Sequence, residues 1–151
     1  MKNILVLCTG NSCRSQMAEG WLKYFAIQKN LELEIFSAGT EKTKVKADAI
    51  KVMQEAGVDI SGHTSKTLYE VPDPWNFDVV ITVCDSANET CLAYPAKTTR
   101  LHVSFPDPSG GTLERWREVR DMLKEMAEKL VAGLGQNDIP SEEELKPKSL
   151  V

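Results

Sequence analysis

Two short runs of branched apolar residues, 3–7 and 77–83, constrain the fold more than any other feature of the chain. A near-continuous apolar run of this length suits a strand that is buried on both faces, as in a parallel sheet. Strand patterns also occur at residues 33–37 and 101–105. Apolar residues recur at helical spacing over residues 15–28, 47–56 and 113–134. Because strands alternate with helices, we predict an α/β fold, a three-layer sandwich with a four-stranded parallel sheet flanked by helices.

The length of 151 residues fits a single catalytic domain, which we expect to span residues 1–135. Residues 136–151 are polar and include Pro140 and Pro147, so we expect a loosely held tail with at most a short helical turn. Lysine and arginine total 18 against 22 acidic residues, and the net charge of −4 provides no general attraction for nucleic acid or an anionic membrane. We expect neither as a partner, and we expect a monomer.

The N-terminal apolar run is too short for a secretory signal, and no stretch approaches the length of a membrane span. Both observations predict a cytoplasmic protein, whose thiols are kept reduced. A cysteine in that compartment is more often reactive or metal-binding than part of a structural disulfide. The candidates are Cys8, Cys13, Cys84 and Cys91.

Cys8 lies where the first predicted strand ends, and Arg14 lies at the start of the first predicted helix. A loop that enters a helix offers free backbone N–H groups and the positive end of the helix dipole, and these bind a tetrahedral oxyanion. Arg14 adds a planar pair of donors. The same field stabilises a thiolate, so we expect Cys8 to be a nucleophile at neutral pH. The expected oxyanion-binding residues are Thr9, Gly10, Asn11, Ser12, Cys13, Arg14 and Ser15.

Other interpretations of these cysteines are weaker. Cys8 and Cys13 could be small buried apolar residues, but the combination of strand, loop, Cys-x5-Arg-Ser and helix favours a functional loop. A nucleotide-binding phosphate loop is disfavoured because no Gly-Lys-Ser/Thr follows the glycine. A zinc module is disfavoured because the spacings Cys8-x4-Cys13 and Cys84-x6-Cys91 are not the tight x2 pairs of zinc sites. We expect no metal site and no cofactor.

The segment 8–19, Cys-Thr-Gly-Asn-Ser-Cys-Arg-Ser-Gln-Met-Ala-Glu, resembles the active-site signature of two related groups of enzymes. These are the low-molecular-weight protein tyrosine phosphatases and the thioredoxin-coupled arsenate reductases of the same fold. The similarity extends to Ser37-Ala38-Gly39, to residues 59–65 and to Asp107-Pro108. The resemblance implies that Asn11 braces the loop, that Ser15 hydrogen-bonds the Cys8 sulfur, and that Asp107 donates a proton to the leaving oxygen.

The loop alone cannot separate these two activities, because phosphate and arsenate have nearly the same shape and charge. Cys84 follows an apolar strand pattern and is expected at the same sheet edge as Cys8. Cys91 comes seven residues later, after a segment with a capping-box pattern, and a helix of that length spans roughly 10 Å. Because bridged cysteines need Cα atoms within about 7 Å, a disulfide between them requires this weakly helical segment to unwind.

The resemblance implies that this cysteine pair relays oxidation outward in the arsenate reductases, whereas typical phosphatases lack the pair. Those phosphatases usually carry aromatic residues after the Asp-Pro, but here Ser109-Gly110-Gly111 follows. Gln16 stands where they often have proline. We therefore predict an arsenate reductase in which Cys8, Cys84 and Cys91 act in turn and thioredoxin regenerates the thiols. The alternative is a phosphatase that hydrolyses phosphomonoesters through a Cys8 phosphocysteine.

A potassium ion near the loop is a further feature of some family reductases. The matching positions here are Asn11, Glu19, Ser37 and Thr64, but Lys66 replaces the acidic residue of that site. Because an ammonium group repels a cation, we expect no potassium site, or a weak one in which Lys66 supplies the charge.

Overall fold

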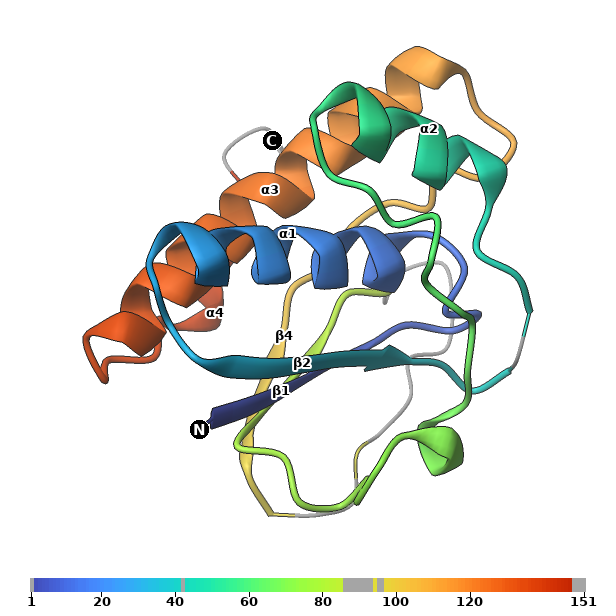
Figure 1. Ribbon diagram of the computed structural model, residues 1–151. Coiled ribbons are helices and arrows are strands. Elements are labelled where there is room, and N and C mark those ends of the chain that lie inside the picture. Colours follow the sequence, from blue (N-terminus) through green and yellow to red (C-terminus); the bar gives the residue numbers. More distant parts are fainter. Residues whose placement is uncertain (1, 42, 86–93, 95–96, 148–151) are drawn as a thin grey trace.

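In the part of the chain that the structure describes, the strands form one four-stranded parallel sheet (Figure 1). The computed structural model describes residues 2–41, 43–85, 94 and 97–147. The strands lie in the order β2-β1-β3-β4. The bounds are β1 (Lys2–Leu7), β2 (Leu33–Ala38), β3 (Val79–Thr82) and β4 (Thr99–His102), and all neighbouring pairs are parallel. The predicted four-stranded parallel sheet is confirmed.

One face of the sheet carries the main core. Helices α1 (Arg14–Gln28), α2 (Ala47–Glu55) and α3 (Leu113–Gly135) lie together above the sheet in Figure 1. Ile4 and Val6 of β1 belong to this core, while Leu5 and Leu7 belong to a second cluster on the opposite face. Because both faces of β1 are fully buried, the strand lacks the polar alternation of a half-exposed strand.

The opposite face of the sheet is covered differently in the described part of the chain. There the 3₁₀ turn η1 (Leu68–Glu70) and the coil that leads to β3 lie below the strands (Figure 1). Leu68, Val71 and Phe77 from this connection fill the second cluster. The flanking layers are therefore helical on one face and, in the described residues, mainly irregular on the other.

The two later strands are shorter than the sequence predicts. Phe77 precedes β3 and packs into the second cluster, where its carbonyl oxygen accepts a hydrogen bond from Thr98. After β4 the chain leaves the sheet, so residues 103–105 are not strand. The carbonyl oxygen of Phe105 then points to Arg14 instead of to a neighbouring strand. Both departures come from contacts that are distant in sequence.

The short helical turn expected in the polar tail is present, and in the described residues it is held against the core. Helix α4 (Glu142–Leu145) begins with a capping box in which Ser141 and Glu144 each accept a backbone hydrogen bond. Leu145 is fully buried in the main core, and Glu142 accepts a hydrogen bond from the backbone of His102. One buried leucine and a capped turn are enough to hold the segment.

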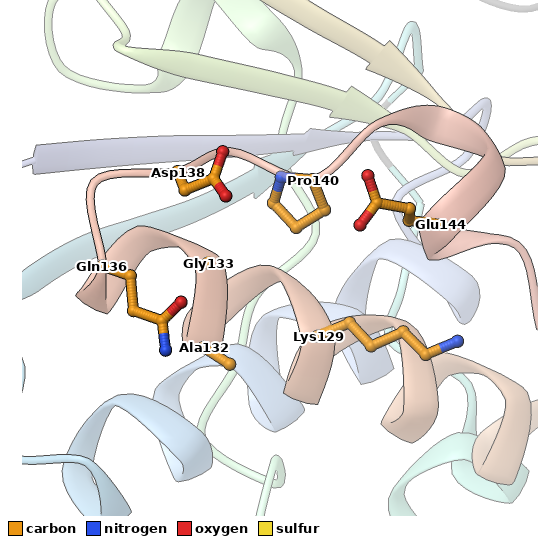
Figure 2. Close-up of a pocket in the computed structure, with 7 residues that line it drawn as sticks. All are labelled: Lys129, Ala132, Gly133, Gln136, Asp138, Pro140 and Glu144. Atoms are coloured by element: carbon orange, nitrogen blue, oxygen red, sulfur yellow. The ribbon is translucent and has the colours of Figure 1, made fainter.

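A hollow of about 480 Å³ lies where the tail returns beside α3 (Figure 2). Lys129 borders it from α3, and Asp138 and Glu144 border it from the tail. It contains no cysteine and no residue of segment 8–15, so it is separate from the predicted chemistry. Among the described residues, no helix combines the length and apolarity that crossing a membrane requires.

Candidate active site

The loop that follows β1 is held from below by the end of β2. The backbone N–H of Cys8 donates to the carbonyl oxygen of Ala38 at 3.2 Å, and that of Thr40 donates to Thr9 at 2.9 Å. Gly39 lies between these contacts: a Cβ atom there would be 2.6 Å from the Thr9 carbonyl oxygen and 2.8 Å from the Asn11 nitrogen. The loop therefore rests directly on a residue that has no side chain.

The Cys8 sulfur is buried and has a hydroxyl group beside it. The hydroxyl oxygen of Ser15 lies 3.0 Å from Cys8 Sγ. Asn11 Nδ2 donates to Ser15 Oγ at 2.9 Å and to Ser37 Oγ at 3.0 Å. Asn11 has a left-handed backbone, with φ of 48°, a conformation that asparagine tolerates better than most residues. These are the contacts that the resemblance implies for Asn11 and Ser15.

Arg14 and Asp107 meet above the loop. Arg14 is the first residue of α1 and is buried, and its Nη1 donates to the carbonyl oxygen of Phe105 at 3.0 Å. Its Nη2 lies 3.8 Å from Asp107 Oδ2, and the Asp107 side chain is 44% exposed. The structure thus brings Asp107 to the loop from a position 93 residues beyond Arg14.

The Asp107 carboxyl is held as an anion in the free site. Partial burial acts to raise its pKa, but hydrogen bonds from Ser109, the charge of Arg14 and a contact with Cys13 lower the pKa below its usual value. The backbone N–H of Ser109 donates to Asp107 Oδ1 at 3.0 Å. An anion bound beside this carboxylate would raise its pKa, because a neighbouring like charge disfavours the ionised form.

Cys13 is a buried free thiol on the same loop. Its Sγ lies 3.7 Å from Asp107 Oδ1, in a position to donate. Burial, and next the negative charge of Asp107, raise the pKa of Cys13 above its ordinary value. The thiol is therefore neutral near pH 7, which agrees with a packing role.

Cys84 follows β3 at the sheet edge where Cys8 follows β1. Leu7 of β1 pairs with Thr82 of β3, and the backbone N–H of Val83 donates to Leu7 at 2.9 Å. Cys84 is completely buried in the same core cluster as Cys8. Cys84 is disulfide-bonded, whereas Cys8 and Cys13 are free thiols. Cys91 and the helix predicted just before it lie outside the described residues.

A second polar group lies beneath the loop, centred on buried Glu19 of α1. Its carboxylate accepts hydrogen bonds from Lys23 at 2.6 Å and from Ser37 at 2.5 Å. Lys66 Nζ donates to the carbonyl oxygen of Thr64 at 3.3 Å, so the Lys66 ammonium group lies beside Thr64. Lys23 was missed by the sequence analysis, although its spacing of four from Glu19 is a signal for an ion pair on a helix.

The sequence and the structure can now be compared with known proteins. Residues 3–140 match the low molecular weight phosphotyrosine protein phosphatase family. The chain belongs to this family. An arsenate reductase from Staphylococcus aureus (strain bovine RF122 / ET3-1) is 41% identical over 123 residues, which are 82% of this chain and 91% of that protein.

Solved structures of family members agree with this assignment. An arsenate reductase in the phosphate-binding state superposes with a TM-score of 0.73 at 36% identity and covers 87% of this chain and 98% of that one. An arsenate reductase in the oxidized state gives a TM-score of 0.70 at 34% identity, with 89% and 99% covered. The fold and the family membership are thus established by sequence and by structure.

Proposed function

We propose that the protein reduces arsenate to arsenite through a relay of three cysteines, which thioredoxin regenerates. The observation that carries the proposal is the placement of Cys84 at the same sheet edge, and in the same buried cluster, as the Cys8 nucleophile. A phosphatase needs only the loop, Arg14 and the acid, whereas a second buried cysteine behind the nucleophile serves a thiol relay. Relatives at 41% identity are arsenate reductases, and one structural neighbour is an arsenate reductase in its oxidized state.

The first step is binding and attack. The loop from Cys8 to Arg14 surrounds the oxyanion with backbone N–H groups at the start of α1, and Thr9 Oγ1 is buried there without a hydrogen-bond partner among the described residues. The Cys8 thiolate forms a bond to arsenic while the bond from arsenic to one hydroxyl group of hydrogen arsenate breaks. Asp107, protonated when the anion binds beside it, donates one proton to this hydroxyl group, which leaves as water.

The second step transfers two electrons. Cys84 is disulfide-bonded in the structure, so this step starts only after that disulfide has been reduced. The Cys84 thiolate then attacks the Cys8 sulfur, so a Cys8–Cys84 disulfide forms while the electron pair of the sulfur–arsenic bond stays on arsenic, which leaves as arsenite. In the third step the Cys91 thiolate attacks Cys84, the bond to Cys8 breaks, and Cys8 is again a thiolate. The disulfide of Cys84 and Cys91 is then reduced by the dithiol of thioredoxin.

This cycle requires a compartment in which thiols are returned to the reduced state. We infer that the protein works in the cytoplasm, where a dithiol reductant and reduced cysteines coexist. The cycle passes through both thiols and a disulfide, and the structure holds both states, since Cys8 and Cys13 are free thiols and Cys84 is disulfide-bonded.

The alternative function is hydrolysis of phosphomonoesters through a Cys8 phosphocysteine. Family membership and the grouping of Cys8, Arg14 and Asp107 favour it. The segment after Asp107 argues against a site for an aryl group, because it consists of Pro108, Ser109 and two glycines and supplies no aromatic surface.

The decisive experiment measures arsenate-dependent NADPH oxidation with thioredoxin and thioredoxin reductase present. We expect turnover by the wild type and loss of turnover in Cys84→Ser and in Cys91→Ser. Hydrolysis of para-nitrophenyl phosphate is measured with the same preparations. The protein would be a phosphatase if the wild type and Cys84→Ser both hydrolysed para-nitrophenyl phosphate rapidly while neither showed arsenate-dependent oxidation of NADPH.

A further inference from the structure

Gln16 lies in the first turn of α1 and is completely buried, although its side chain is polar. Its Nε2 lies 3.1 Å from the carbonyl oxygen of Asn11, 2.9 Å from Asn11 Oδ1 and 3.0 Å from the carbonyl oxygen of Thr64. Its Oε1 lies 3.0 Å from His63 Nδ1. One buried amide therefore connects α1, the anion loop and the 63–66 segment.

The orientation of this amide is determined by its neighbours. Two of the groups around Nε2 are backbone carbonyl oxygens, which can only accept, so the NH₂ group of Gln16 must face them. The carbonyl group of the side chain then faces His63, whose Nδ1 must carry the hydrogen. This bond survives protonation of His63, because Nδ1 is a donor in both states.

The two hydrogens of Gln16 Nε2 are shared among three acceptors, one of which is Asn11 Oδ1, and Gln16 therefore acts together with the backbone of Lys66 in orienting the Asn11 amide. Asn11 Oδ1 receives hydrogen bonds from Gln16 Nε2 at 2.9 Å and from the backbone N–H of Lys66 at 2.9 Å. With its oxygen held between two donors, the Asn11 side chain must present its NH₂ group to Ser15 and Ser37. If the Asn11 amide were flipped, its Nδ2 would face the donors of Gln16 and Lys66. The hydroxyl groups of Ser15 and Ser37 would then face Oδ1 and lose the hydrogen bond from Nδ2.

The Asn11 orientation directs the Ser15 hydroxyl hydrogen. Because Ser15 Oγ already accepts from Asn11 Nδ2, its own O–H is free to donate to Cys8 Sγ at 3.0 Å. A hydrogen bond to a thiolate stabilises the charged form of the sulfur. The path from Gln16 to the Cys8 sulfur thus runs through two side chains, Asn11 and Ser15.

We propose that Gln16 is a positioning residue for the nucleophile: it locks the amide orientation of Asn11 and so keeps the Ser15 hydroxyl donating to Cys8. The proposal rests on Cys8 being the nucleophile, which the reductase and the phosphatase alternatives share. It can therefore fail while either function stands, and it can hold if arsenate proves not to be the substrate.

The test measures the pH dependence of Cys8 alkylation by iodoacetamide in the fully reduced protein, with the modified cysteine identified by peptide mass. Gln16→Met keeps the side-chain length and removes every hydrogen bond. We expect the midpoint of the alkylation profile to rise by about one pH unit, with a loss of up to tenfold in rate near neutral pH. Gln28→Met, at the exposed end of the same helix, is the matched control and should leave the profile unchanged.

A double-mutant comparison separates positioning from general damage to the fold. Ser15→Ala alone should raise the midpoint, and adding Gln16→Met to Ser15→Ala should raise it no further, because the path to the sulfur is already cut. Gln16→Leu, which removes the donors and adds no charge, serves if Gln16→Met does not fold. An unchanged midpoint in folded Gln16→Met or Gln16→Leu, or equal shifts with and without Ser15, would overturn the proposal.

Discussion

Replacement of Gly39 by alanine tests how closely the anion loop depends on the strand beneath it. A Cβ atom at this position would lie 2.6 Å from the Thr9 carbonyl oxygen, 2.8 Å from the Asn11 nitrogen and 2.9 Å from the Cys8 carbonyl oxygen. The shortest contact is about 0.8 Å below an ordinary van der Waals contact of 3.4 Å. All three atoms belong to the backbone, so no flexible side chain can give way.

The expected result of Gly39→Ala is a large loss of activity with a smaller loss of stability. Overpacking of this kind costs about 1–3 kcal/mol of unfolding free energy. A displacement of the loop close to 1 Å costs roughly 10²-fold in rate, because Cys8 and the anion-binding groups lose their mutual geometry. The assays are arsenate-dependent NADPH oxidation and thermal unfolding of the same preparation.

Gly62→Ala is the control for this experiment. A Cβ atom at Gly62 would meet nothing within 4 Å, so activity and stability should both stay near the wild-type values. A folded Gly39→Ala protein with wild-type turnover would refute the reasoning. It would show that the loop from Cys8 to Asn11 keeps its activity although the added methyl group displaces its backbone.

Three further predictions concern charged groups around the loop. Arg14→Lys keeps the charge but loses the planar pair of donors, so kcat/KM for arsenate should fall by roughly 10²-fold, and an unchanged value would exclude a two-point contact. Burial lowers the pKa of His63 below its ordinary value of 6.5 in the folded protein. The unfolded chain therefore takes up this proton at a higher pH than the folded protein does. The stability that neutral His63 contributes above pH 6.5 is lost as the pH falls below 6.5. The fall in melting temperature between pH 7.5 and 5.5 should therefore be steeper in the wild type than in His63→Gln, and parallel curves would contradict this. Because Lys66 places an ammonium group beside the Thr64 carbonyl, exchange of sodium for potassium should leave turnover unchanged, and a severalfold stimulation by potassium would oppose the expectation.

The parts of the site that are contiguous in sequence could be predicted well. The segment from Cys8 to Ser15 forms its loop and helix start through local backbone geometry, so its residue types and spacing carry the information directly. Asp107 was assigned from a resemblance, and the structure places it 3.8 Å from Arg14. The pairing of Cys91 stays a prediction.

The residues that support the loop could not be predicted, because their partners are distant in sequence. Gln16 bonds the Thr64 carbonyl 48 positions away, and Gly39 matters only because β2 runs beneath the loop. A glutamine in a helix or a glycine after a strand has no local signal that shows such contacts. The packing of the tail could not be predicted for the same reason, since the burial of Leu145 depends on a core assembled from elsewhere.

The amino-acid sequence by itself determined the parallel sheet and the loop at the end of the first strand, and it predicted that Cys8 is the nucleophile. Each of these depends on residue periodicity or on neighbours within one turn of chain. Only the tertiary structure decided that Gln16 and Gly39 support that loop, and it placed Asp107, which the resemblance had named, beside Arg14. Those contacts join segments that meet only when the sheet and its helices pack together, and close packing, rather than local preference, selects the side chains that fit there.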